Sequence, residues 1–247
     1  SRGMINWDDS EDQLAKMEQE LLEHLRFLYG DARADTVYPR LETLVRKYRQ
    51  EIGDAAAKKV GYFDEQDAVL ITYGDMVQDT DEAPLQTLAK FLEHTVDGII
   101  NTVHLLPFYP YSSDDGFSVI DYRKVDPNLG DWGDVARIGR SFRLMFDAVV
   151  NHISAESEWF KGFLRDEPRY RDYFTVVEAE TDLSQVFRPR TLPLTTKVET
   201  VAGERQVWTT FSADQIDLNF ANPELLLEIV DTMLFYVAHG ARFIRLD

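Results

Sequence analysis

Ala-Arg-Phe-Ile-Arg-Leu-Asp, residues 241–247, is the segment from which the architecture can be inferred. It is mainly apolar and follows Gly240, so it predicts a buried strand. Side chains alternate between the two faces of a strand, which places Arg245 and Asp247 on the same face. Such a pair can keep the carboxylate ionised, as an attacking nucleophile must be. Taken alone, an Arg-x-Asp pattern also fits a structural salt bridge at the end of a strand.

The chain before this segment alternates between strand-like and helix-like patterns. Strands are predicted at residues 69–73, 102–107 and 144–150, and helices at residues 84–94, 135–142 and 223–239. This alternation indicates a parallel sheet with crossover helices. The fourth strand follows the third after a long interval, which predicts an inserted subdomain over residues 153–221. Within it we expect a helix at residues 156–164 and short strands near residues 175–177 and 207–211.

A helical region precedes this alternating pattern. Ser10 and Gln13 form a capping-box signature, leucines at helical spacing follow, and Gly30 ends the run. A second helix is predicted to start near Pro39, since proline is favoured in the first turn of a helix. This helical hairpin either packs on the main domain or takes part in a homodimer contact.

The composition excludes several classes of function. The net charge is −18, from 26 basic and 44 acidic residues, which argues against partners such as nucleic acid or an anionic membrane surface. No segment approaches the roughly 20 apolar residues of a membrane span. The first residues lack a basic region followed by an apolar core, so we expect no secretory signal and a cytoplasmic location. The chain has no cysteine, which excludes disulfides and thiol catalysis.

Polar residues follow the predicted strands at their carboxyl ends. In residues 107–117, after the second strand, aromatic side chains surround Asp114 and Asp115, and the third strand leads into Asn151 and His152. The carboxyl edge of a parallel sheet is where ligands bind in α/β folds. Aromatic faces beside carboxylates suit a sugar, although each pattern alone also fits a surface turn or a structural histidine.

Together these motifs resemble the α-amylase superfamily. Asp-Ala-Val-Val-Asn-His at residues 147–152 and residues 241–247 are similar to its first two signatures, and Gln-Ile-Asp-Leu-Asn at residues 215–219 is similar to the signature that closes its inserted subdomain. Within the superfamily, the sucrose-phosphorylase-like branch has similar motifs at residues 70–75, 104–108, 114–117, 188–190 and 207–212. The helical residues before 67 resemble an extension of relatives that act on glucosylglycerol, glucosylglycerate or sucrose 6′-phosphate.

The resemblance implies an α/β fold that is the first half, strands 1–4, of a (β/α)8 TIM barrel. The expected parts are an N-terminal helical extension (1–66), barrel strands 1–3 (67–152), the inserted subdomain (153–221), and the third barrel helix with strand 4 (222–247). Four strands cannot close such a barrel. We therefore expect the chain to be the N-terminal part of a longer enzyme, with the rest of the barrel as its partner.

The resemblance also implies roles for individual residues. Asp247 would be the nucleophile that forms a β-glucosyl ester, and Arg245 would hold it ionised and oriented. Substrate contacts are implied for Asp114, Phe117, His152, Arg188, Arg190, Phe211 and Gln215. Of these, Asp114 and His152 would bond glucosyl hydroxyls, and the loop with the two arginines would hold phosphate or an acidic acceptor. Phe187 stands where sucrose phosphorylases have a tyrosine, which argues against sucrose itself.

The implied function is that of a retaining phosphorylase. It would convert a small α-glucoside and phosphate reversibly to α-glucose 1-phosphate and an acceptor, with 2-O-α-glucosylglycerol as the expected glucoside. Glucosylglycerate, sucrose 6′-phosphate and sucrose are the alternatives, and other classes are an α-glucosidase or transglucosidase and a non-catalytic amylase-like module. No metal and no cofactor are expected, with inorganic phosphate as co-substrate. A retaining mechanism needs two carboxyl groups, and the acid/base glutamate is expected beyond residue 247.

Overall fold

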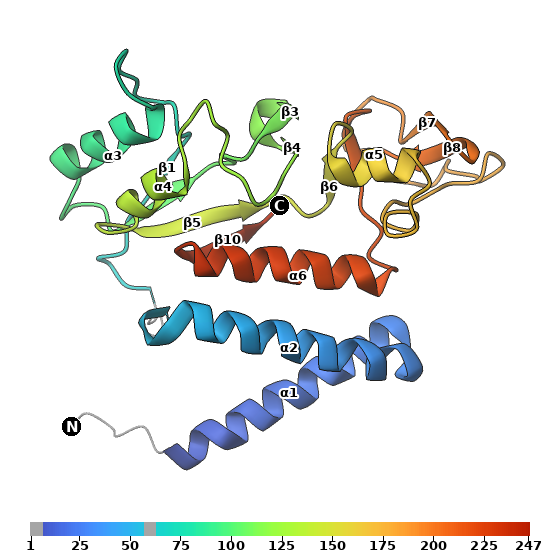
Figure 1. Ribbon diagram of the computed structural model, residues 1–247, viewed down its shortest axis with the longest axis horizontal. Helices are drawn as coiled ribbons and strands as arrows, with labels where there is room; N and C mark the ends of the chain where they lie inside the picture. Colours follow the sequence, from blue (N-terminus) through green and yellow to red (C-terminus); the bar gives the residue numbers. More distant parts are fainter. Residues whose placement is uncertain (1–6, 57–62) are drawn as a thin grey trace. The chain divides into compact units, whose positions relative to one another are not determined.

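The computed structural model describes residues 7–56 and 63–247 (Figure 1). The chain forms two compact units, Ser1–Arg49 and Gln50–Asp247. This division falls inside a helix, and the boundaries expected at residues 66, 152 and 221 stay predictions. Residues 1–6 and 57–62 of the expected extension, and the side chains of the predicted capping box at Ser10 and Gln13, lie outside the described part of the chain.

Two helices make up the N-terminal region, α1 (Trp7–Tyr29) and α2 (Asp31–Ala56). Gly30 separates them with a φ of 79°, a left-handed conformation that glycine adopts without strain. The predicted start of the second helix near Pro39 is wrong, because α2 begins at Asp31 and contains Pro39. Ala34 and Val37, which are buried before the proline, already belong to its apolar face.

The second unit contains a parallel sheet of four strands in the order β1-β2-β5-β10. Its strands are β1 (Val69–Thr72), β2 (Thr102–Leu105), β5 (Arg143–Ala148) and β10 (Ala241–Leu246). The crossover helices are α3 (Pro84–Thr95), α4 (Trp132–Ile138) and α6 (Pro223–Ala238). All of these elements were predicted from apolar spacing, and their order is the one expected for the first four strands of a (β/α)8 barrel.

Strand register decides which side chains meet at the carboxyl edge of the sheet. Arg245 on β10 is the partner of Asp147 on β5, and β2 pairs with β5 on its other side. In Figure 1, β5 and β10 end close together near the point marked C. The edge therefore collects side chains from three strands that are distant in the sequence.

A hairpin and a short 3-10 turn lie between β2 and β5. The hairpin consists of β3 (Tyr111–Ser113) and β4 (Ser118–Val119), which are antiparallel, and the turn η1 (Asp114–Gly116) connects them. Asp114 and Asp115 have φ values of 55° and 51°, so both adopt the left-handed conformation that is rare for residues with a side chain.

The inserted region after β5 contains two further antiparallel pairs. β6 (His152–Ser154) pairs with β9 (Gln215–Asp217), and β7 (Thr195–Thr200) pairs with β8 (Gly203–Trp208). The helix α5 (Glu158–Leu164) lies between β6 and β7 in the sequence. The strand predicted near residues 175–177 is only an isolated bridge from Val176 to Val207, because β7, which was not predicted, is the main partner of β8.

Aromatic side chains fill the core between the sheet and its helices. Phe108, Tyr109, Phe146 and Tyr236 are fully buried. Tyr109 and Tyr236 stack with ring centroids 5.3 Å apart, and the Phe108 ring meets that of Phe146 edge to face. Among the described helices, none has the length and apolar character needed to cross a membrane.

Candidate active site

The predicted pair at the end of β10 is present. Arg245 Nη2 lies 2.8 Å from Asp247 Oδ1, and Arg245 Nη1 donates to Asp147 Oδ1 at 2.5 Å. The hydrogen bond to Asp147 is the main cause of a raised pKa of Arg245. One guanidinium thus bridges two carboxylates, of which Asp147 is completely buried and Asp247 is 26% exposed.

Sequence reasoning assigned no role to Asp147 or to His104, although both lie in quoted motifs. His104 Nε2 donates to Asp147 Oδ2 at 2.7 Å, and the Tyr109 hydroxyl donates to the Asp147 carbonyl oxygen at 2.9 Å. A buried carboxylate is stable only when its oxygens are hydrogen-bonded or paired with a charge. His104 and Arg245 thus occupy the two carboxylate oxygens of Asp147. The contact with Asp147 fixes Arg245 Nη1 and leaves Nη2 for Asp247.

A second cluster lies around Asp114, Gln215 and His152. Gln215 Nε2 donates to Asp114 Oδ2 at 2.8 Å and lies 3.2 Å from His152 Nε2. His152 Nε2 donates to the carbonyl oxygen of Phe117 at 2.8 Å, and the Asn151 amide lies 3.2 Å from its other ring nitrogen. The contacts with Phe117 and Asn151 fit a neutral imidazole with its proton on Nε2.

The two clusters interact electrostatically through His152. Burial lowers the pKa of His152, and the hydrogen bond to Phe117 opposes the decrease. The charges of Asp217, Asp247 and Asp114 also act to raise the pKa. The histidine is therefore within electrostatic range of both the carboxylate at the sheet edge and the carboxylate of the loop.

Arg190 and Phe211 border the second cluster. Arg190 Nη2 lies 3.6 Å from Asp114 Oδ2, and the guanidinium lies over the Phe211 ring at 5.6 Å. The Phe211 ring is 5.3 Å from that of His152. Arg188, from the same loop, is exposed and shares no hydrogen bond or ion pair with these residues in the described chain. All of the predicted substrate-contact residues except Arg188 therefore lie in one cluster.

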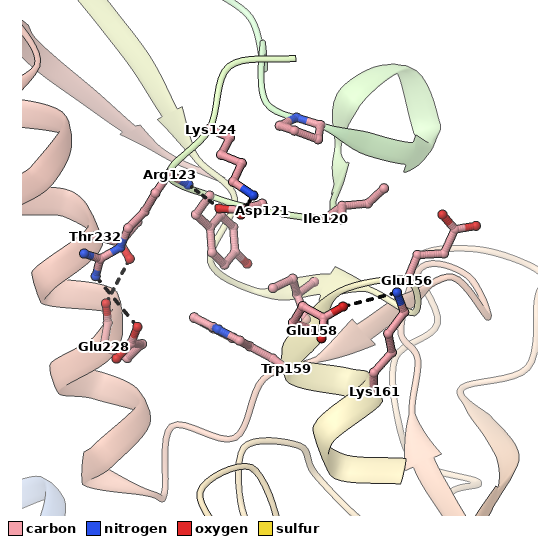
Figure 2. A pocket seen from close by; sticks show the side chains of 13 residues that line it. Ile120, Asp121, Arg123, Lys124, Glu156, Glu158, Trp159, Lys161, Glu228 and Thr232 are labelled. Carbon is pink, nitrogen blue, oxygen red and sulfur yellow. Dashed lines mark hydrogen bonds and ion pairs between the residues drawn. The ribbon is translucent and has the colours of Figure 1, made fainter. Parts of the chain in front are cut away.

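A separate pocket of about 350 Å3 is lined by the segment from Ile120 to Lys124, α5 and α6 (Figure 2). Its cations are matched by anions: Lys124 Nζ lies 3.4 Å from Asp121 Oδ2, and Lys161 Nζ lies 3.3 Å from Glu158 Oε1. None of the predicted site residues lines this pocket. The cations of the pocket therefore pair with carboxylates, whereas the carboxylate of Glu156, which also lines it, has no ion-pair partner among the described residues.

Within the described residues, no group of three or more histidine, aspartate or glutamate side chains is placed to hold a metal ion. The cluster around Arg245 and the cluster around Asp114 are held together by hydrogen bonds and ion pairs. Chemically, they offer a carboxylate beside a guanidinium, and acceptors and donors suited to sugar hydroxyls. The absence of a metal from the reaction stays a prediction.

Comparisons with known proteins identify the relatives of this chain. The chain is 53% identical over 232 residues to a glucosylglycerate phosphorylase of Allomeiothermus silvanus, an alignment that covers 94% of this chain and 40% of that protein. It is 30% identical over 194 residues to a glucosylglycerol phosphorylase of Marinobacter adhaerens, covering 72% of this chain and 38% of that protein. The chain therefore spans about 40% of the length of the curated relatives it matches.

A comparison of folds also finds a phosphorylase as a relative. The crystal structure of sucrose 6F-phosphate phosphorylase from Thermoanaerobacter thermosaccharolyticum matches with a TM-score of 0.66 and 30% identity, over 76% of this chain and 41% of that chain. The sheet of this chain thus corresponds to the first part of a TIM-barrel phosphorylase. The family model described as alpha amylase, catalytic domain, matches residues 85–247. The chain belongs to the α-amylase catalytic-domain family.

Proposed function

We propose that the protein containing these residues is a retaining glycoside phosphorylase. It converts a small α-glucoside and phosphate reversibly to α-glucose 1-phosphate and a free acceptor. The observation that carries the proposal is the Asp247 carboxylate, which Arg245 Nη2 holds at 2.8 Å at the carboxyl edge of a parallel sheet. The similarity to a glycoside phosphorylase along 94% of the chain supports this chemistry over plain hydrolysis.

The mechanism follows from the position of Asp247. One carboxylate oxygen attacks the anomeric carbon and forms a β-glucosyl ester, while the bond from that carbon to the acceptor oxygen breaks and that oxygen takes a proton from the acid/base glutamate expected beyond residue 247. Phosphate then attacks the same carbon and displaces the carboxylate, so the product keeps the α configuration. Arg245 remains beside the carboxylate through both steps because its other arm is bound to the buried Asp147.

The second cluster binds the glucosyl unit in this proposal. Asp114 Oδ2, which faces Gln215 and Arg190, accepts hydrogen bonds from sugar hydroxyls. His152, which lies within electrostatic range of both Asp114 and Asp247, contacts further hydroxyls of the same sugar. Phe117 and Phe211 supply apolar faces for the ring. Orientation by several weak contacts brings the anomeric carbon within reach of the nucleophile.

Glycerate is the acceptor that we propose, so the glucoside is glucosylglycerate. Sequence analysis favoured glucosylglycerol, which is less well supported: the glucosylglycerol phosphorylase is 30% identical and the glucosylglycerate phosphorylase 53% identical. Arg190 is about half exposed, and its guanidinium can bind a carboxylate through two hydrogen bonds. A charged acceptor gains this interaction, whereas glycerol has no group that matches it.

Acceptor-dependent phosphate release tests the proposal. The full-length protein is incubated with α-glucose 1-phosphate and, in parallel, with glycerate, glycerol, fructose 6-phosphate or fructose. We expect phosphate release with glycerate to exceed that with glycerol by at least about tenfold, the equivalent of one charge-assisted hydrogen bond. A reaction without acceptor is the control for hydrolysis. Equal release with and without acceptor would indicate a hydrolase, and no release with any acceptor would refute phosphorolysis.

A further inference from the structure

The loop that presents Asp114 has a conformation that its own sequence does not favour. Asp114 and Asp115 have positive φ values of 55° and 51°, and Gly116 follows with a φ of 101°. A Cβ atom at Gly116 would lie 2.9 Å from the carbonyl oxygen of Pro107, so only glycine fits there. Two successive left-handed residues with side chains persist only where surrounding contacts hold them.

Asp214 supplies these contacts on both sides of the turn. The hydroxyls of Ser112 and Ser113, directly before Asp114, each donate to Asp214 Oδ2 at 2.5 Å. The Ser118 hydroxyl, after the turn, donates to the carbonyl oxygen of Asp214 at 2.8 Å. A single residue thus binds both ends of the strained segment.

Asp214 is itself fixed in the inserted region. Its carbonyl oxygen also accepts from the Ala155 backbone N–H at 3.1 Å, and Ser154 Oγ lies 3.4 Å from Asp214 Oδ1. Burial raises the pKa of Asp214, but the serine hydroxyls lower it more, so its pKa lies below the ordinary value. The next residue, Gln215, donates to Asp114 Oδ2. Asp214 therefore binds the serine side chains on either side of the turn, and Gln215 binds the Asp114 carboxylate within it.

We propose that Asp214 is a positioning residue for glucosyl binding: it holds the loop of residues 112–118 in the conformation in which Asp114 can accept hydroxyl hydrogen bonds. This role rests on the proposed function, in which Asp114 binds the glucosyl unit. Asp214 itself touches no substrate.

The proposal predicts a particular kinetic pattern. Without Asp214, the loop occupies its binding-competent conformation for only a fraction of the time, and the apparent dissociation constant rises by the inverse of that fraction. Saturating substrate restores the competent conformation, so the chemical step is preserved. For a competent fraction of about one tenth, the KM for α-glucose 1-phosphate rises about tenfold, and kcat changes by less than about twofold.

The test compares three variants of the full-length protein with the wild type. Asp214→Ala removes both side-chain acceptor oxygens, keeps the backbone carbonyl that accepts from Ser118, and should show the rise in KM. Asp214→Asn keeps one carbonyl oxygen for the serine hydroxyls, so most of the wild-type KM should return. Asp182→Ala is the matched control, because Asp182 is an exposed carboxylate of the inserted region that accepts from the Ser184 backbone N–H at 2.9 Å. An unchanged KM in Asp214→Ala, or a loss confined to kcat, would overturn the proposal.

Hydrogen exchange gives a readout that needs no activity. The Phe117 amide donates to the Asp114 carbonyl oxygen at 2.9 Å, and the Ile120 amide donates to the Pro110 carbonyl oxygen at 2.7 Å. Both amides are therefore protected from exchange while the loop of residues 112–118 keeps this conformation. These amides should exchange faster in Asp214→Ala and at the wild-type rate in Asp182→Ala. Equal exchange in both variants would refute the role of Asp214. Ser113→Ala, which removes one donor and leaves Asp214 in place, gives the same test if Asp214→Ala fails to fold.

The two proposals can fail separately. A wild-type protein without phosphate-dependent turnover refutes the proposed function, and the exchange rates still decide whether Asp214 holds the loop. Conversely, an active wild type with equal KM values and equal exchange rates in all variants refutes only the role of Asp214.

Discussion

The candidate active site is built from two regions that hold their side chains by different means. At the sheet edge, Asp147 and Arg245 are register partners on β5 and β10, so strand pairing places both. In the loop after β3, Asp114 has a positive φ and is held by side chains far along the chain, such as that of Gln215. The first region is positioned by many backbone hydrogen bonds together, and the second by a few separate side-chain contacts.

This contrast implies different responses to substitution. Changes at the sheet edge should remove chemistry or stability and leave glucosyl binding largely intact. Changes in the loop should weaken binding and leave the chemical step largely intact, as proposed for Asp214. Three predictions, in decreasing order of expected effect, test whether the two regions separate in this way.

Asp247→Asn in the full-length protein should give the largest effect. An amide cannot act as the nucleophile, so kcat should fall on the order of 10⁴-fold. The KM should change little, because the Asp114 loop is intact. Steady-state phosphate release measures both constants, and an unchanged melting temperature is the control for folding. Retention of more than about a tenth of the activity would mean that another group forms the glucosyl ester.

Asp147→Asn should mainly reduce stability. The amide keeps the shape of the side chain, but it leaves Arg245 without its buried counter-charge and gives His104 Nε2 a weaker acceptor. The pair is buried only on the Asp147 side, since the Arg245 side chain is 46% exposed and also pairs with Asp247. We therefore expect a loss of about 2–3 kcal/mol, the upper range for hydrogen bonds to a charged group, which urea unfolding can measure.

Asp67→Asn is the matched control for Asp147→Asn. Asp67 pairs with Arg143 at the opposite end of the sheet, where both side chains are partly exposed. Its replacement should cost clearly less than that of Asp147, because ion pairs near the surface contribute little to stability. Equal losses in the two variants would show that burial at the carboxyl edge has no special importance.

The smallest effect concerns pH. Because burial lowers the pKa of His152, the unfolded chain binds more protons than the folded protein just below the ordinary value of 6.5. The contribution of His152 to stability is therefore present above about pH 6.5 and is lost as the pH falls toward the lowered pKa.

His152→Gln tests this pH dependence. Urea midpoints measured between pH 7.5 and 5 should decrease less in the variant than in the wild type. His94→Gln, which changes an exposed histidine on α3, should follow the wild type. If the wild type and His152→Gln lose stability in parallel, the histidine is not the group that titrates.

Local patterns predicted much of the fold. The four parallel strands and their crossover helices were found because a buried strand or an amphipathic helix repeats its apolar residues at a fixed spacing. The errors arose where apolar spacing does not determine where an element begins or whether it forms. Pro39 is favoured in the first turn of a helix, but it lies in the interior of α2, where the apolar face that begins before it holds the helix. The polar residues 195–200 show no apolar pattern although they form β7.

Part of the candidate site could also be predicted from the sequence. The pair of Arg245 and Asp247 follows from the alternation of side chains along one strand. The family motifs predicted Asp114, His152 and Gln215 as site residues, and the structure brings these three into one cluster. The role of Asp147 depends on the register between β5 and β10, which no local pattern reveals. The same holds for His104, which belongs to a third strand.

The sequence by itself determined the order of strands and helices, the charged pair at the end of β10 and the membership of the family, because these depend on residues close together in the chain or on motifs. Only the tertiary structure decided that Asp147 joins His104 to Arg245 and that Asp214 holds the strained loop around Asp114. Ser113 and Asp214 are separated by 101 positions, and a hydrogen bond over that distance forms only once the inserted region has folded against the β3–β4 hairpin.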